Sequence, residues 1–119
     1  MHELGMLLPV VKAVEVAATK AGATAVEAVG LRVGTQSGLV PDALEGAWPL
    51  ATANTLVQGA RLELEVIQAA IWCPTCDATQ PIDEFYALVC PVCGTPSGNL
   101  VRGREFEVAY ADMDIDKSD

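Results

Sequence analysis

The stretch "CPTC" at residues 73–76 recurs as "CPVC" at residues 90–93, and the two motifs hold all four cysteines of this 119-residue chain. Two residues between a pair of cysteines let a tight turn direct both sulfurs at one point, and the proline in each motif favours that turn. Two such turns supply four thiolates in a tetrahedron, which is typical of a closed structural zinc site. The spacing therefore predicts one bound metal ion, with zinc as the expected occupant. Its ligands are Cys73, Cys76, Cys90 and Cys93.

Three other uses of these cysteines compete with zinc. Iron bound as in rubredoxin uses similar motifs, and spacing alone does not separate the two metals. Two disulfides are favoured in secreted proteins, whereas this chain shows no positively charged segment ahead of an apolar stretch near residue 1. A redox dithiol needs one pair of cysteines rather than two. Because four thiolates leave no open coordination position, we expect the metal to stabilise the fold without catalysing a reaction.

Alternating apolar and polar residues predict a strand on each side of the cysteine segment. The strands are "RLELEV" at residues 61–66 and "EFEVAY" at residues 105–110. In the first strand, the side chains expected to face the core are Leu62, Leu64 and Val66. In the second, the side chains expected to share one side are Phe106, Val108 and Tyr110. We therefore expect the cysteine segment to be inserted between two strands of one sheet.

The first half of the chain adds two predicted helices and a third predicted strand. Apolar residues at helical spacing predict a helix from about residue 5 to residue 21, and a second helix that begins at Pro41. Between them, "AVEAVGLRVG" at residues 25–34 alternates as a half-buried strand does. Pro9 should lie near a first turn or bend its helix, and Pro49 should kink or shorten the second.

The order of these elements predicts an α+β fold. Two helices cover one face of a three-stranded sheet, and a zinc-ribbon-like module with four cysteines is inserted between its last two strands.

Composition limits the classes of function. The formal net charge of −9, with only seven Lys and Arg residues, argues against nucleic-acid binding, which requires basic residues to neutralise phosphates. No apolar run approaches the roughly 18 residues that a membrane span needs. With the cysteines used and one histidine left, no pair of nucleophile and base is visible. We therefore expect a cytoplasmic protein that is not an enzyme and contacts neither nucleic acid nor membrane.

The only histidine, His2, stands beside the N-terminus. The α-amine of Met1, the backbone nitrogen of His2 and its imidazole can bind one metal ion together, closing a five-membered and a six-membered ring. Such an in-plane nitrogen chelate favours Ni(II) or Cu(II). Glu3 could complete the site through its backbone nitrogen or carboxylate, although an acidic residue at a helix N-terminus is also favoured by the helix dipole. Because single histidines are often incidental, the spacing permits a nickel site without establishing one.

Several motifs occur in one characteristic order: "MHE" at residues 1–3, "VG..SG..P.AL" at residues 33–44, "GA.LELE" at residues 59–65 and the two CPxC motifs. In this order the chain resembles, over almost its whole length, the HypA/HybF family of nickel metallochaperones for nickel–iron hydrogenase maturation. The resemblance implies a small α/β nickel-binding domain and a zinc-binding domain. It also implies that His2, with Glu3 beside it, is the nickel ligand and that the four cysteines are the zinc ligands.

The resemblance further implies delivery of Ni(II) to the precursor of the hydrogenase large subunit, alongside a partner GTPase, HypB; some members of the family also serve urease. One departure concerns the site itself, because Val40 stands where the family often has an acidic residue.

These observations predict three parts of the chain. Residues 1–70 plus 99–112 form a discontinuous α/β nickel-binding domain, residues 71–98 form the zinc-binding module, and residues 113–119 form an acidic tail. The alternative function is a zinc-ribbon adaptor for protein interaction in which His2 has no nickel role. An iron-bearing electron carrier is a third hypothesis.

Overall fold

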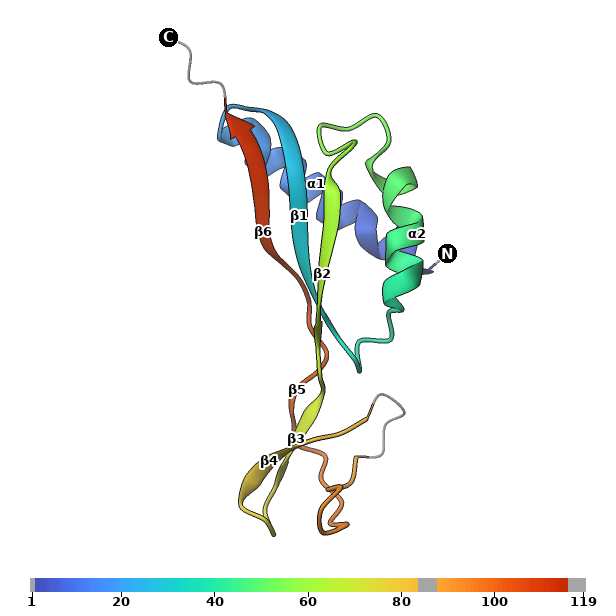
Figure 1. The fold of residues 1–119 in the computed structure, drawn as a ribbon, viewed down its shortest axis with the longest axis vertical. Helices are drawn as coiled ribbons and strands as arrows, with labels where there is room; N and C mark the ends of the chain where they lie inside the picture. The colour runs from blue at the N-terminus through green and yellow to red at the C-terminus, as the bar shows by residue number, and fades with distance from the viewer. Residues whose placement is uncertain (1, 84–87, 116–119) are drawn as a thin grey trace. The chain divides into compact units, whose positions relative to one another are not determined.

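The computed structural model describes residues 2–83 and 88–115. In these ranges the elements follow one another as shown in Figure 1: α1 (His2–Lys20), β1 (Ala23–Gly34), α2 (Pro41–Thr52), β2 (Arg61–Ile67), β3 (Ala70–Cys73), β4 (Ala78–Pro81), β5 (Leu100–Arg102) and β6 (Phe106–Ile115). One sheet has the strand order β2-β1-β6, and a second has the order β4-β3-β5. None of the helices in these ranges is long and apolar enough to span a membrane.

The chain divides into two compact units. Unit 1 comprises Met1–Leu31, Leu39–Leu64 and Val108–Asp119, and unit 2 comprises Arg32–Gly38 and Glu65–Glu107. The α+β prediction is confirmed, because two helices lie on one face of the sheet β2-β1-β6 and the cysteine segment is inserted between β2 and β6. The unit boundaries differ from the predicted domain boundaries, and β6 extends to Ile115, within the segment expected to be a tail. The division into domains stays a prediction.

Both helices of unit 1 contain a proline and continue past it. Helix α1 begins at His2, earlier than expected, and packs Leu7, Val11, Val14 and Ala18 into the core. Pro9 cannot donate to the carbonyl of Gly5, but both residues are exposed, so water can hydrate that carbonyl. In α2, Pro49 likewise cannot donate to the carbonyl of Glu45, and both of these residues are exposed. A proline on the solvent side therefore neither ends nor shortens these helices.

The central strand β1 departs from simple alternation. Ala28, Val29, Gly30 and Leu31 are all buried in succession, which fits a strand with a neighbour on each side. At Gly30 a Cβ would overlap the ring of Tyr110, whose hydroxyl donates to the Glu63 carboxylate. Tyr110 therefore crosses from β6 over β1 to β2.

Val66, predicted to face the core, is exposed instead, and Val108 and Tyr110 of β6 are exposed as well. For Tyr110 the reason is the missing side chain at Gly30, which leaves room for the ring to lie across the strand. The two-residue repeat of β6 does not indicate this position of Tyr110, because it depends on a residue of the neighbouring strand.

In unit 2 the chain closes on itself where the cysteine segment leaves and returns. Gly34 N–H donates to the Glu105 carbonyl at 2.8 Å, and Gln36 N–H donates to the Gly103 carbonyl at 2.7 Å. Gly103 has a φ of 129° and lies so close to Ala69 that a Cβ at position 103 would overlap it. The two ends of the inserted segment therefore lie together, as its position between strands of one sheet requires.

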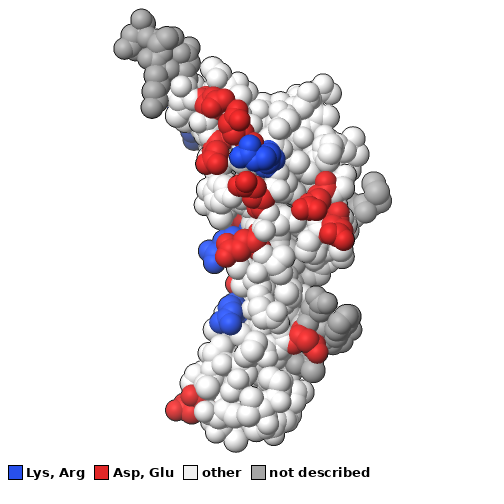
Figure 2. All heavy atoms as spheres, in the orientation of Figure 1, with Lys and Arg blue, Asp and Glu red and all other residues white. Residues whose placement is uncertain are grey.

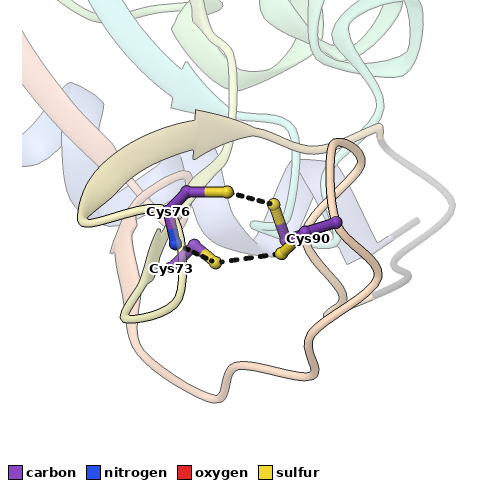
Figure 3. Close-up of side chains that lie close together, drawn as sticks. Cys73, Cys76 and Cys90 are labelled. Carbon is purple, nitrogen blue, oxygen red and sulfur yellow. Dashed lines mark hydrogen bonds between the residues drawn. The ribbon is translucent and has the colours of Figure 1, made fainter.

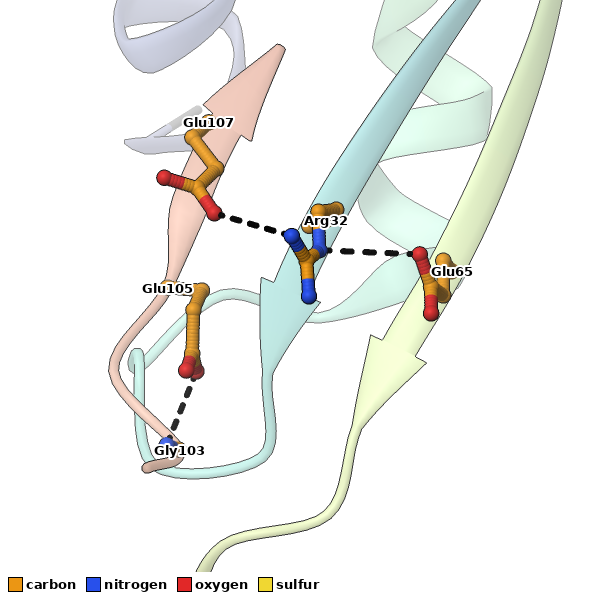
Figure 4. Close-up of polar contacts among 5 residues, drawn as sticks. All are labelled: Arg32, Glu65, Gly103, Glu105 and Glu107. Atoms are coloured by element: carbon orange, nitrogen blue, oxygen red, sulfur yellow. Dashed lines mark hydrogen bonds and ion pairs between the residues drawn. The ribbon is translucent and has the colours of Figure 1, made fainter. Parts of the chain in front are cut away.

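Arg32 on β1 lies between a glutamate of β2 and a glutamate of β6 (Figure 4). Its Nε is 3.6 Å from Glu65 Oε1, and one terminal guanidinium nitrogen is 3.6 Å from Glu107 Oε1. Beside this group, the Glu105 carboxylate accepts the Gly103 N–H at 2.8 Å. Because the Arg32 side chain is 43% exposed, these pairs contribute little to stability. They do link all three strands at the level where β2 and β6 leave the sheet.

Candidate metal centres

The four cysteine sulfurs converge in unit 2, and all lie within 4.8 Å of one another. Cys73 Sγ is 3.5 Å from Cys93 Sγ, and Cys76 Sγ is 3.8 Å from Cys90 Sγ (Figure 3). A zinc ion bound to four thiolates at its usual bond length requires sulfurs about 3.8 Å apart. All four cysteines are free thiols, so the disulfide alternative does not describe this arrangement. The donors are sulfurs in tetrahedral spacing, which fits zinc and equally fits iron.

Two similar turns bring the sulfurs together. The first follows β3, where the N–H of Cys76 lies 3.4 Å from the Cys73 sulfur. In the second, Gly94 N–H donates to the Cys90 carbonyl at 2.9 Å. The residue after each CPxC motif has a left-handed conformation, Asp77 with φ 53° and Gly94 with φ 78°. Each turn thus ends by reversing the chain immediately after its second sulfur.

The surroundings of the thiols differ. The hydroxyl of Thr95 lies 3.1 Å from the Cys93 sulfur, and it and the Thr95 backbone N–H lower the pKa of that thiol to about 6. Hydrogen bonding with Cys93, together with burial, raises the pKa of Cys76 to about 12. In the metal-free protein Cys93 therefore ionises before Cys76. A divalent ion must displace the remaining protons, so metal binding releases protons.

Thr95 contacts the cysteine cluster, and the sequence analysis did not single it out. Its Oγ1 lies 3.0 Å from Oγ1 of Thr75, so a hydroxyl of the first motif and one that follows the second motif meet beside Cys93. The signal was a threonine two residues after the last cysteine, which is too common to carry a prediction alone.

The second candidate centre is the start of α1. His2 is the first helical residue, and its side chain is exposed. Met1, whose α-amine is a predicted ligand, lies outside the described residues. Glu3 is 9% exposed, and its Oε2 accepts the Val40 N–H at 3.3 Å. The predicted nickel residues are therefore adjacent in the chain, but the side chains of His2 and Glu3 have different environments.

The Glu3 carboxylate serves the N-terminus of α2. Val40, the N-cap residue of α2, makes no side-chain capping bond, and Pro41 follows it at the first helical position. The carboxylate of Glu3 accepts the N–H of Val40 itself, which is the bond that a glutamate makes to the N-cap residue in a capping box. Hydrogen bonds from the N–H groups of Glu3 itself and of Val40 lower the pKa of Glu3, against the opposing effect of burial.

A cleft of about 250 Å³ lies beside Glu3 between the two helices. Its lining residues are Glu3, Leu4, Ala43, Gly46, Ala47 and Leu50.

The fold and the sulfur cluster define a small α+β metal-binding protein. The sequence matches, over residues 1–113, the family described as hydrogenase/urease nickel incorporation, metallochaperone, hypA. The hydrogenase maturation factor HypA of Roseiflexus sp. (strain RS-1) is 40% identical over 116 residues, covering 98% of this chain and 94% of the relative. HypA of Chloroflexus aggregans is 35% identical over 108 residues, covering 91% of this chain and 95% of the relative. The chain therefore belongs to the HypA family and is a nickel metallochaperone for hydrogenase maturation.

Solved structures show the same fold. The solution structure of the nickel metallochaperone HypA from Helicobacter pylori superimposes with a TM-score of 0.66 at 18% identity, covering 96% of this chain and 98% of that one. A second structure, titled solution structure of HypA protein, gives a TM-score of 0.68 at 21% identity, covering 95% of this chain and 96% of that one. None of these relatives favours the alternative of an adaptor without a nickel role.

Proposed function

We propose that this metallochaperone binds Ni(II) at its N-terminus and holds Zn(II) in the four-cysteine centre. The nickel ligands are the α-amine of Met1, the backbone nitrogen of His2 and the His2 imidazole, with Glu3 contributing. The observation that carries this proposal is that α1 begins at His2 and that the His2 side chain is exposed. The match to the family also begins at residue 1.

The first turn of a helix suits such a chelate. Its N–H groups have no acceptor within the helix, so nickel can replace the amide proton of His2 without breaking a helical hydrogen bond. The in-plane set of nitrogen donors suits Ni(II), whereas zinc has no electronic preference for it. An exposed side chain also lets the ion be exchanged, as delivery requires. Acid that protonates the imidazole should release nickel, because a ligand imidazole is neutral.

Glu3 contributes to this site through its backbone nitrogen. Its carboxylate is already engaged with the N–H of Val40, so ligation by that group would cost the hydrogen bond that holds α2. Val40 itself offers an apolar side chain and no ligand. Ligation by the backbone nitrogen displaces the N–H that Glu3 donates to its own carboxylate but keeps the bond from Val40, so the carboxylate still joins the start of α1 to α2.

Zinc in unit 2 is supported by the sulfur spacing and by the closed donor set. Four thiolates leave no position for water or substrate, so the ion holds the fold and the protein catalyses no turnover. A colourless purified protein with about one zinc per chain is expected; the visible absorption of iron–thiolate would contradict it.

The family carries out hydrogenase maturation, which implies partners in that process. We infer delivery in the cytoplasm to the precursor of the hydrogenase large subunit, alongside the GTPase HypB. The description of the family also names urease, so a urease client is a second destination.

The test is calorimetric titration of Ni(II) into zinc-loaded protein with its native N-terminus. A variant with two extra N-terminal residues keeps His2 but moves the free amine away, and His2→Ala removes the imidazole. Tight one-to-one binding is expected only for the native protein, with zinc content the same in all three. Equal nickel affinity in the native and extended proteins would place nickel elsewhere.

A further inference from the structure

We propose that the free edge of β6 and the apolar groove beside it bind an extended segment of a partner protein whose apolar side chains alternate with Lys or Arg. The segment would add a strand to the sheet. This surface is separate from the nickel site, so the proposal stands or fails independently of the proposed function.

The first observation is the open edge. Strand β6 runs from Phe106 to Ile115, and within the part of the chain that the structure describes it is the last strand in the order β2-β1-β6. An edge strand presents N–H and C=O groups that have no strand partner and can template another strand. Partner proteins use such edges by adding a strand, whose main-chain hydrogen bonds give affinity.

The second observation is the groove, which has a volume of about 300 Å³. It lies between α1 and β6 and is lined by Ala13, Val14, Ala17, Val108, Ala111 and Met113. Ala13 and Ala17 are exposed on α1, and their small side chains leave the space open. A strand added beside β6 would direct every second side chain into this apolar space.

The third observation is the charge on the opposite side of the same strand. Asp112 and Asp114 alternate with Ala111 and Met113 and are exposed. Figure 2 shows acidic side chains over the part of the open face where β6, β1 and β2 lie, with fewer basic side chains among them. Opposite charges on neighbouring strands attract, so the outward side chains of an added strand would be basic. Because apolar and acidic side chains alternate in β6, the added strand should alternate apolar and basic side chains.

The Glu27–Asp114 pair supports a basic partner. Hydrogen bonding with Asp114 of β6 and the charge of that carboxylate raise the pKa of Glu27 on β1, and the charge of Arg61 offsets this only in part. A cation from an added strand would relieve the repulsion between these two carboxyl groups. A second copy of this chain is disfavoured, because antiparallel pairing of two β6 edges would bring Asp112 and Asp114 close to the same residues of the other copy.

The experiment titrates a short peptide of alternating Lys and Val into ¹⁵N- and ¹³C-labelled, zinc-loaded full-length protein. We expect amide shifts and slowed hydrogen exchange concentrated in β6, with methyl shifts at Met113 and Ala17. The control peptide has the same sequence but is N-methylated at every backbone amide, so it keeps each side chain and charge while losing the donors. It should not bind at the β6 edge.

Three variants sharpen the result. Ala17→Arg fills the groove with a bulky cation and should abolish binding while the rest of the spectrum stays native. Asp112→Asn should weaken binding about two- to fivefold, as expected for loss of one exposed ion pair. Glu45→Gln removes the same charge from the exposed surface of α2 and should leave affinity unchanged.

Two outcomes would overturn the proposal. Equal affinity for the N-methylated peptide would mean that charge alone drives binding. A dimer in sedimentation experiments, paired through β6 and unaffected by the peptide, would mean that the edge is occupied by a second copy. Loss of nickel binding in the titration described above would have no bearing on either result.

Discussion

Unit 1 and unit 2 are stabilised in different ways. Unit 1 has a layer of helices on a sheet, in which Leu7, Leu31 and Leu44 are completely buried. In unit 2 the buried apolar cluster consists of Ala69, Ile71, Cys73, Ile82 and Cys90. Two members of that cluster are metal ligands in our proposal, so unit 2 has little apolar core of its own. Small folds of this kind depend on a metal ion, whereas unit 1 can be stabilised by apolar burial.

The two proposed metal centres show the same contrast. The cysteine sulfurs are brought together by two turns that reverse the chain, and they form a closed set of four donors. The nickel ligands belong to the first turn of a helix, with an exposed imidazole. A closed set of ligands suits an ion that stays, and an exposed chelate suits an ion that is handed over. The cysteine centre therefore suits a structural ion, and the N-terminal chelate suits an ion that is delivered.

The largest effect is expected from Cys73→Ser. Structural zinc contributes an apparent free energy of about 10 kcal/mol or more in small zinc-binding peptides. Loss of the buried sulfur should release the ion and unfold unit 2, while unit 1 keeps its core. The measurement is zinc per chain together with amide exchange, which should become fast in β3 and stay slow in α1.

Thr75→Val is the matched control for this variant. It changes an exposed residue of the same turn, beside Thr95, and keeps all four sulfurs. Its zinc content should stay at about one per chain. Zinc retained by Cys73→Ser would contradict the assignment of Cys73 as a ligand. Loss of protection in α1 together with β3 would show that the two units are not stabilised independently.

The next effect concerns the apolar core of unit 1. Leu44→Ala removes a completely buried side chain of α2, and such truncations cost about 2–5 kcal/mol. Leu50→Ala makes the same change on the same helix at a side chain that is 65% exposed. It should alter the free energy of unfolding by less than about 0.5 kcal/mol. Urea unfolding measures the free energy of unfolding of both variants, and amide exchange in β1 provides an independent measurement. Equal losses of stability in the two variants would contradict the proposed core.

Local pattern predicted those features that depend on neighbouring residues in the chain. The CPxC spacing predicted four converging sulfurs, and helical spacing predicted both helices. The order of elements predicted the sheet with its insertion. Each of these follows from a repeat or motif within about 20 residues.

Features that depend on distant residues were not predictable in this way. The outward position of Tyr110 depends on the gap at Gly30 in another strand. The early start of α1 coincides with the hydrogen bond between Glu3 and Val40, which are 37 positions apart. The second sheet, β4-β3-β5, consists of strands of three or four residues, which are too short for alternation to indicate.

The smallest expected effect concerns Glu3→Gln and its dependence on pH. The folded-state pKa of Glu3 lies below its ordinary value of 4.5 because N–H groups of Glu3 and Val40 donate to the carboxylate. A group with a lowered folded-state pKa stabilises the fold above its unfolded pKa, and this contribution is lost as pH falls through the folded value. Wild type should therefore be more stable than Glu3→Gln near neutral pH, and the gap should close below pH 4.5.

The measurement is the free energy of unfolding of both proteins across this pH range. Both lose their zinc as the thiols protonate, so the difference between them isolates the effect of residue 3. Glu45→Gln, an exposed charge on α2, corrects for the change in net charge. A gap that stayed constant down to low pH would show that the carboxylate of Glu3 does not hold α2 through its charge. The first turn of α1, which carries the proposed nickel ligands, would then not be tied to α2 by the charge of Glu3.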